Sequence, residues 1–418
     1  MTVLVFYIGL FLAAFAIVAF IRRRMEPEQD FRSLKTVTFG DESAVRPDRW
    51  ASIISVLVIF LIWGAFTGSK YAPFHVPGPF SGETAFIYTA ENAAGDTDDA
   101  SVEIIVHPVG QSADAPDVEP GDGFAKDDGA TVAMWRSVLI RAVRNDDGEG
   151  LRVIRVAGQP IAPEQTVYVG NGSVTMTAKG SLNFSPSRGM QMEPIWLPSP
   201  EGVVQRFFEI ASEGYQNFTL WQHLGWSLLR VIVGFFLGAL VGIPLGYAMG
   251  LSGWFRGWFD PIVEFMRPVP PLALIPLVII WFGIWETGKI ILLFLAALWI
   301  MIIAARAGVS GVNITKIHAA YSLGASRWQI MRHVIVPNSL PEIFTGARVA
   351  MGVCWGTVVA AELVAAQKGA GMMIIAASKF QLTDIVIMGI VLIGIIGYSI
   401  DILMRRAENW LVPWKGRS

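Results

Sequence analysis

Long apolar runs alternate with polar segments along the chain and fall into two groups. Two runs lie near the N-terminus, and five follow a polar middle segment. Their approximate limits are 3–21, 50–66, 221–250, 260–282, 287–306, 341–366 and 385–404. At a rise of about 1.5 Å per residue, helices of these lengths cross a hydrocarbon core of about 30 Å. The pattern predicts a mainly α-helical membrane protein with seven spans, in which a core of five to six spans follows one additional N-terminal span.

Basic residues set the expected orientation of these spans. Arg22, Arg23 and Arg24 follow the first run directly, whereas a signal peptide carries its basic residues before the apolar run. We therefore favour a retained helix with its N-terminus outside over a cleaved signal peptide. Because basic residues are enriched in cytoplasmic loops, residues 22–49 are expected inside. The same rule places inside the later loops that carry Arg256, Lys316, Arg327, Arg332, Arg405 and Arg406, and the tail at 411–418.

Between residues 71 and 196 the pattern changes to short alternating runs separated by turn-forming residues, which is typical of strands. The candidate strands are AFIYTAEN, SVEIIVH, LRVIRVAG, TVYVGN, SVTMTAKG and SLNFSPS, with turns such as NDDG and Asn171-Gly172 between them. They resemble the strands of bacterial cadherin-like and immunoglobulin-like repeats, with the last hairpin placed first, at residues 85–108. The resemblance implies an all-β, sandwich-like extracytoplasmic insert, in which this hairpin completes a sheet built mostly from residues 131–190. Residues 1–70 then form two helices with a cytoplasmic linker, and 197–410 form the core.

Composition narrows the function classes. Of the 418 residues, 53% are hydrophobic and 16% charged, and 32 Lys and Arg nearly balance 34 Asp and Glu, so no overall basic field favours nucleic-acid binding. The one cysteine, Cys354, forms no intramolecular disulfide, and the five histidines lack metal-ligand spacing. We assign no catalytic residue and no metal ligand. Acidic turns such as the one at Asp96, Asp98 and Asp99 either bind Ca²⁺ or are solvated, and the solvated reading is favoured because the spacing does not match an EF-hand loop.

A glycine recurs at every fourth position of the first core span. Such small-residue spacing lets helix backbones approach closely in a membrane. Each step of four residues overshoots a turn by about 40°, so the stripe winds around the helix, which leaves room for contact with more than one neighbour. The alternative is that membrane helices simply tolerate glycine. The five positions are Gly234, Gly238, Gly242, Gly246 and Gly250.

The next span is rich in proline, which removes backbone donors and breaks or kinks a helix. Its prolines are Pro261, Pro268, Pro270, Pro271 and Pro276. Irregular backbone at membrane depth is tolerated where it is buried in protein or lines a cavity, so Pro270 and Pro271 are candidates for the pathway or its gate. Glu362, in AAELVAA, is a further candidate, because an intramembrane carboxylate is by default a functional hypothesis. The alternative for Glu362 is a structural bond near the outer interface.

Residues 316–341, KIHAAYSLGASRWQIMRHVIVPNSLP, carry basic residues together with apolar residues at helical spacing. The pattern predicts two short helices joined by a turn at Gly324. Ser326 and Gln329 have the spacing of a capping box that begins the second helix, and Pro337 is expected to end it. An amphipathic helix pair in the cytoplasm either packs on its own spans or docks into a groove of a partner.

This stretch resembles the cytoplasmic coupling loop of binding-protein-dependent ABC importer permeases, whose pattern is E-A-A-x-x-x-G-A followed by I-x-L-P. From residue 197 to about 410, the segments WQHLGWSLLRVIVGFFLGALVGIPLGYAMG, RPVPPLALIPLVIIWFGIWETGK and AAELVAA resemble the subfamily that serves taurine, alkanesulfonates, nitrate and related anions. Where the family has the leading Glu, this chain has His318. The loop residues that correspond to the pattern or adjoin it are His318, Ala319, Ala320, Gly324, Ala325, Ser326 and Pro337.

The resemblance implies a type I ABC importer permease of the bacterial inner membrane that works by alternating access. It implies as partners a second copy of the chain, two ATPase subunits on the coupling loop and an extracytoplasmic solute-binding protein. No phosphate-binding loop occurs, since Gly288-Lys289 is followed by Ile290, so ATP and Mg²⁺ are expected on the partner subunits. Taurine or another sulfonate is the expected substrate, and nitrate or another small anion is the alternative. A membrane receptor that senses through residues 71–196 is the other class considered, and a membrane enzyme is disfavoured because catalytic constellations are missing. For the periplasmic insert we favour a role in seating the binding protein over capping the outer opening or contacting the cell envelope.

Overall fold

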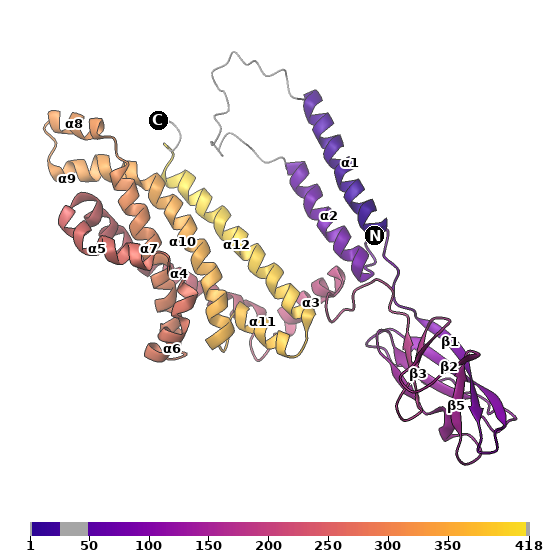
Figure 1. Cartoon of the computed structure of the whole chain (residues 1–418). Coiled ribbons are helices and arrows are strands. Elements are labelled where there is room, and N and C mark those ends of the chain that lie inside the picture. Colours follow the sequence, from indigo (N-terminus) through magenta and orange to yellow (C-terminus); the bar gives the residue numbers. More distant parts are fainter. Residues whose placement is uncertain (1, 26–48, 415–418) are drawn as a thin grey trace. The chain divides into compact units, whose positions relative to one another are not determined.

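The computed structural model describes residues 2–25 and 49–414, which form two compact units, Met1–Glu201 and Gly202–Ser418 (Figure 1). Most of the predicted cytoplasmic linker, with Arg32, Lys35 and Arg46, and the last residues of the tail lie outside the described residues. Among the described residues, six helices are long and apolar enough to cross a membrane, or up to seven if a bent pair counts as one span.

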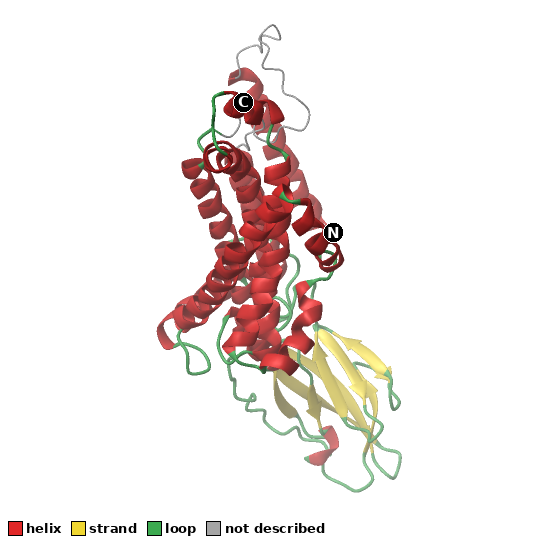
Figure 2. Cartoon of the chain, turned by 90° about the vertical axis from the view of Figure 1, so that its left-hand side faces the viewer, coloured by secondary structure: helices red, strands yellow, loops and turns green. Residues whose placement is uncertain are grey.

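The first unit begins with the helices α1 (Thr2–Met25) and α2 (Arg49–Thr67), followed by nine strands in a lobe of their own (Figure 2). The strands are β1 (Gly82–Glu91), β2 (Thr97–His107), β3 (Asp128–Ala133), β4 (Val138–Ile140), β5 (Arg152–Val156), β6 (Gln159–Pro160), β7 (Thr166–Val169), β8 (Gly172–Met176) and β9 (Leu182–Pro186). They form a five-stranded sheet in the order β3-β2-β1-β5-β6 and a four-stranded sheet in the order β4-β9-β8-β7.

The two sheets share one core, so residues 82–186 form a β-sandwich, called here the β-domain. Alternate side chains of each strand are buried, as the alternation in sequence requires, and the rings of Phe86 and Phe184 stack across the sheets with centroids 6.1 Å apart. The predicted pairing of the early hairpin with the later segment is confirmed, because Tyr88 of β1 lies opposite Val156 of β5 in antiparallel register. Strand β3, which pairs in parallel with β2, was not among the predicted strands.

The second unit is helical. Its helices are α3 (Pro200–Glu213), α4 (Leu220–Leu251), α5 (Gly253–Met266), α6 (Ile275–Phe282), α7 (Glu286–Ser310), α8 (Ile314–Ser322), α9 (Arg327–Ile330), α10 (Val336–Ala365), α11 (Ala370–Lys379) and α12 (Thr383–Leu411). Buried side chains of α4, α7 and α10 form its main core. Figure 1 shows α8 and α9 at one end of this core and α11 at the other. These ends are called here the coupling end and the α11 end.

The glycine stripe of α4 packs along a single neighbour, α7. A Cβ built on each glycine would meet one side chain of α7. The pairs are Gly234 with Leu293, Gly238 with Ala297, Gly242 with Met301, Gly246 with Ala305 and Gly250 with Val309. These α7 residues also recur every fourth position, so both rows wind at the same rate and stay in register. The nearest atoms at all five glycines therefore belong to α7 alone, because α7 follows the stripe along its whole length.

Candidate functional site

At the coupling end, a helix pair with a tight turn leads into a long helix. α8 begins at the N-cap Asn313, whose side chain accepts a hydrogen bond from the Thr315 amide at 2.9 Å. Gly324 has a φ of +82°, a left-handed conformation that favours glycine, so the predicted turn is present. The capping box is also present: the Gln329 amide donates to Ser326 Oγ at 3.3 Å, and the Ser326 amide donates to Gln329 Oε1 at 2.8 Å.

The prediction that Pro337 ends the second helix is wrong. After α9 the backbone forms a π-helical turn over Met331–Ile335 and continues into α10. Pro337 lies in the first turn of α10, directly after the π-helical turn, and the helical backbone continues through it from Arg327 to Val364. The proline therefore does not end the helix, and α10 joins the coupling end directly to the membrane core.

The helix pair has an inner and an outer face. Ile317, Ala320 and Ala325 pack with Ile330 and Val309 into a small apolar cluster. Tyr321, Leu323 and Trp328 point outward, and the side chains of Leu323 and Trp328 are 88% and 71% exposed. Of the two alternatives considered for this pair, packing on the chain's own spans is present on the inner face, and docking on a partner stays a prediction for the outer face. The remaining coupling residues, His318, Ala319, Gly324 and Ser326, are exposed.

The proline-rich span is broken. α5 and α6 are bent by 91° at the segment that holds Pro270 and Pro271, and a short 3₁₀ helix, Pro271–Leu274, precedes α6. Pro261, by contrast, lies inside α5 without interrupting it. α5 is tied to α7 by Arg306, which pairs with Asp260 and donates to Glu264 at 3.0 Å. Residues 260–282, predicted as one span, hold the last part of α5, the 3₁₀ helix and α6.

Near the α11 end, Glu362 lies in a buried polar network. Its carboxylate accepts hydrogen bonds from Ser227 Oγ at 2.8 Å, Arg230 Nη1 at 2.5 Å and the Gly371 amide at 3.0 Å. The donors come from α4 and from the start of α11, while Glu362 itself lies near the end of α10. The carboxylate therefore joins three elements, and its role as a pathway or gate residue stays a prediction.

Arg230 is the centre of this network, and its side chain is fully buried. Besides Glu362, it pairs with Glu286 at the start of α7, with Nε–Oε2 and Nη2–Oε1 distances of 2.5 and 2.7 Å. Lys289 Nζ donates to Glu286 Oε1 at 3.1 Å, and Lys368 Nζ lies 3.5 Å from the ring centroid of Trp226. The fold thus gathers three cations, Arg230, Lys289 and Lys368, around two carboxylates at one end of the core. This group was not predicted from the sequence, where its one available signal is the single Arg in SLLRVIV.

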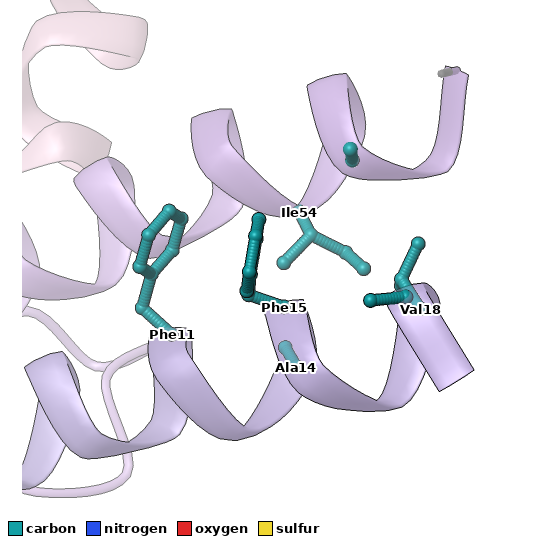
Figure 3. Close-up of a pocket in the computed structure, with 7 residues that line it drawn as sticks. Phe11, Ala14, Phe15, Val18 and Ile54 are labelled. Carbon is teal, nitrogen blue, oxygen red and sulfur yellow. The ribbon is translucent and has the colours of Figure 1, made fainter. Parts of the chain in front are cut away.

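A groove between α1 and α2 offers no chemistry. It has a volume of about 240 Å³ and is lined by Phe11, Ala14, Phe15, Val18, Ala19, Ala51 and Ile54 (Figure 3). All of these side chains are apolar, so the groove suits a hydrocarbon chain and holds no group able to bind or activate a polar substrate. Among the described residues, no group of three or more His, Cys, Asp or Glu side chains is arranged to hold a metal ion.

Comparison with known proteins places the helical unit in a family. The profile described as "Binding-protein-dependent transport system inner membrane component" matches residues 234–412. The chain is 44% identical over 258 residues to the taurine transport system permease protein TauC of Escherichia coli (strain K12), covering 62% of this chain and 92% of TauC. It is 39% identical over 218 residues, or 52% and 81% of the two chains, to the protein named "Putative aliphatic sulfonates transport permease protein SsuC" of the same organism. It is 32% identical over 222 residues to the nitrate import permease protein NrtB of Synechocystis sp. (strain ATCC 27184 / PCC 6803 / Kazusa), and this match covers 52% of this chain and 81% of NrtB.

The apolar helices and these matches define a multi-pass inner-membrane permease. The chain belongs to the family of binding-protein-dependent transport system inner membrane components. It is therefore the membrane subunit of an ABC importer and not an enzyme, since ATP hydrolysis in this family is carried out by separate subunits. Of the permease, receptor and enzyme classes considered from the sequence, family membership selects the permease.

Proposed function

We propose that this permease imports taurine or a related small sulfonate. The observation that carries the proposal is the 44% identity to TauC over 92% of that protein, compared with 32% identity to the nitrate permease NrtB. Nitrate is the second candidate, because the nitrate permease NrtB is also among the relatives.

The test is uptake into proteoliposomes that contain this permease with its ATPase and binding protein. We expect ATP-dependent accumulation of radiolabelled taurine that excess alkanesulfonate reduces and excess nitrate leaves unchanged. The matched control is the same preparation without the binding protein. Accumulation of nitrate and not of taurine would support the second candidate, and uptake that needs no ATP would contradict the importer mechanism.

The outer face of the α8–α9 pair is the proposed docking site for the ATPase subunits, which bind ATP and Mg²⁺. Tyr321, Leu323 and Trp328 are large apolar side chains held outward on a pair whose inner face is already packed. Such a face gains free energy when a partner groove covers it. In this arrangement the coupling end is cytoplasmic, and two copies of the chain enclose the path between their cores.

Co-purification tests this docking face. The variant Leu323→Glu places a charge on the outer face without touching the packed cluster, so we expect the ATPase to be lost from the purified complex. Phe380→Glu is a matched control, because Phe380 is exposed to a similar degree at the α11 end, away from the helix pair. Retention of the ATPase by Leu323→Glu, or equal loss from both variants, would argue against docking at this face.

The β-domain is proposed to be periplasmic and to help seat the binding protein, as expected from the sequence. In support of this role, the domain has a folded core of its own, and the linkers on both sides of it are hydrogen-bonded to the end of α2. Deleting residues 71–190 is expected to weaken binding-protein affinity while the ATPase stays bound. Unchanged affinity and transport after deletion would contradict the seating role.

A further inference from the structure

Two linkers connect the helices of the first unit to the β-domain, residues 68–80 and 187–197, and together they are called here the collar. They are bonded to each other: Gln191 Nε2 donates to the Val76 carbonyl at 3.1 Å, and the Met190 amide donates to the Pro77 carbonyl at 2.6 Å. Gly189 lies so close to Gly78 that a Cβ there would collide with its carbonyl. The collar is therefore a packed piece of structure and not a pair of independent tethers.

The collar is also bonded to the ends of both helices. The Met192 amide donates to the Phe66 carbonyl at 2.9 Å, and the Val76 amide donates to the Ala65 carbonyl at 3.2 Å, both in the last turn of α2. On the other helix, Tyr7 Oη donates to the Phe74 carbonyl at 3.0 Å. The apolar stretch Trp50–Thr67 has 18 residues, which at about 1.5 Å each is close to the thickness of a hydrocarbon core. The collar consequently lies at the depth where hydrocarbon gives way to lipid headgroups.

The exposed side chains of the collar suit that depth. Tyr71 and Trp196 are 81% and 72% exposed, and Phe74, Met190 and Met192 are exposed as well. Large apolar side chains gathered on a short loop mark an interaction surface. Tyr and Trp in particular are enriched where membrane meets water, since one part of each ring is apolar and another forms hydrogen bonds.

A polar hollow lies at the collar end of the β-domain. It has a volume of about 610 Å³, and the side chains that line it include Tyr168, Ser173, Ser185, Ser187 and Arg188. The Ser187 amide donates to Asn171 and its carbonyl accepts from Phe80, which fixes the hollow beside the collar. No carboxylate lines it, and hydroxyls with a guanidinium form a donor set that suits a phosphate.

Chain length places this hollow within reach of the headgroups. Arg188 precedes Met192 by four residues, so its Cα lies within about 14 Å of a residue that is bonded to the last turn of α2. The headgroup layer adds about 5–7 Å beyond the hydrocarbon on each side, and an extended Arg side chain covers much of the remainder.

We propose that the collar and the hollow form a membrane-interface seat for the β-domain. The aromatic side chains of the collar insert among the headgroups of the leaflet on the β-domain's side, and Arg188 with the serine hydroxyls binds a phospholipid phosphate. The bilayer is the occupant, because the surface is continuous with two lipid-facing helices. The seat holds the β-domain at a fixed height above the membrane, whichever solute the permease transports.

Depth measurements on the full chain in nanodiscs of phosphatidylglycerol and phosphatidylcholine test the collar. Cys354 is the one cysteine and is buried, so a Cys354→Ala background accepts single nitroxide labels at Tyr71→Cys, Trp196→Cys and Ala94→Cys. Ala94 follows β1, a ten-residue strand that runs away from the collar for about 30 Å, and serves as the matched control. We expect the two collar labels to be relaxed more by oxygen than by a water-soluble nickel chelate, and the Ala94 label to show the reverse. Collar labels that are relaxed in the same way as the Ala94 label would overturn the seat. If the Cys354→Ala variant does not purify as a monodisperse sample, Cys354→Ser serves as the cysteine-free background.

A second measurement tests the hollow and separates lipid from free anion. Binding of short-chain dihexanoyl phosphatidylglycerol and of inorganic phosphate to the full chain in detergent is titrated separately. Loss of a charge-assisted hydrogen bond corresponds to about a tenfold weaker affinity, so Arg188→Gln is expected to weaken the phospholipid by this factor. Lys179→Gln, which removes an exposed cation from the opposite end of the same sheet, is expected to change nothing. Inorganic phosphate binding as tightly as the phospholipid, or equal loss in both variants, would overturn the headgroup assignment.

Discussion

The absence of a Cβ at Gly238 lets α4 and α7 pack closely. A Cβ on Gly238 would lie 2.6 Å from the Cβ of Ala297 and 2.9 Å from the Phe294 carbonyl, and both neighbours belong to α7. Gly352, in the interior of α10, has nothing within 4 Å of the same position. The two glycines thus stand in helices of similar length with opposite surroundings.

We expect Gly238→Ala to destabilise the helical unit and Gly352→Ala to leave it unchanged or stabilise it slightly. The first substitution overpacks the seam, which costs about 1–3 kcal/mol, while alanine in an open helical position is favoured by about 0.5–1 kcal/mol. Thermal unfolding of the purified chain in detergent measures both. Equal shifts for the two variants would show that helix propensity, and not contact with α7, dominates at these positions.

Asp128 gives the β-domain a pH dependence. The pKa of Asp128 is raised from 3.8 to about 7. The largest cause is burial of the carboxylate, and the second is the nearby charge of Asp146. A pKa that is higher in the folded state means that the folded chain binds the proton more tightly, so stability falls as pH rises from about 4 to about 7. Burial also raises the pKa of Asp146, which acts in the same direction.

The expected result is a β-domain that unfolds at a higher temperature at pH 5.5 than at pH 8. Asp128→Asn should raise the unfolding temperature at pH 8 and flatten most of the dependence, because the amide carries no charge to bury. Calorimetry of the full chain at the two pH values makes the comparison, with Asp114→Asn, in an exposed or half-exposed loop of the same domain, as the control. A wild-type transition that rises with pH would contradict the assignment.

At the scale of elements, the buried network shows why Arg230 is harder to replace than either carboxylate. Arg230 is fully buried and pairs with both Glu286 and Glu362, whereas Glu286 is 39% exposed and keeps Lys289 as a partner. Removing one member of a buried ion pair typically costs about 3–5 kcal/mol, since the other charge stays buried without compensation.

Arg230→Met should therefore destabilise the junction of α4, α7 and α10 far more than Glu286→Gln does. Arg230→Lys should not restore stability, because an ammonium cannot reproduce the two parallel bonds that the guanidinium makes to Glu286. Unfolding temperatures of the purified variants give the ranking. A Lys variant as stable as wild type would indicate that charge alone, and not geometry, holds the junction.

The elements that the sequence predicts correctly are those whose information is local. The Ser326–Gln329 capping box and the turn at Gly324 depend on residues three or fewer positions apart, and both are present. The role of Pro337 depends on whether a helix follows it. A proline by itself does not tell this, because proline is compatible both with the end of a helix and with its first turn. The network around Arg230 is non-local, since residues 227, 230, 286, 362 and 371 meet only when four elements pack. A single arginine in an apolar run indicates that a partner exists but not which one.

At the scale of the whole molecule, the chain has separate hydrophobic cores. The buried cluster of the β-domain draws on residues 86–184, and the buried clusters of the helical unit draw on residues 231–361. The division into units at Glu201 and Gly202 follows this separation. Domains with their own cores can unfold in separate cooperative transitions.

We therefore expect calorimetry of the full chain to resolve two transitions that respond to different substitutions. Asp128→Asn at pH 8 should raise only the transition of the β-domain, and Gly238→Ala should lower only that of the helical unit, because residues so far from any shared partner contribute additively. Combining the two substitutions should shift both transitions by the same amounts as the single variants. One transition that moves with either substitution would mean that the β-domain and the permease core unfold as a single cooperative structure, and the β-domain would then be part of the transporter's stability and not an appended module.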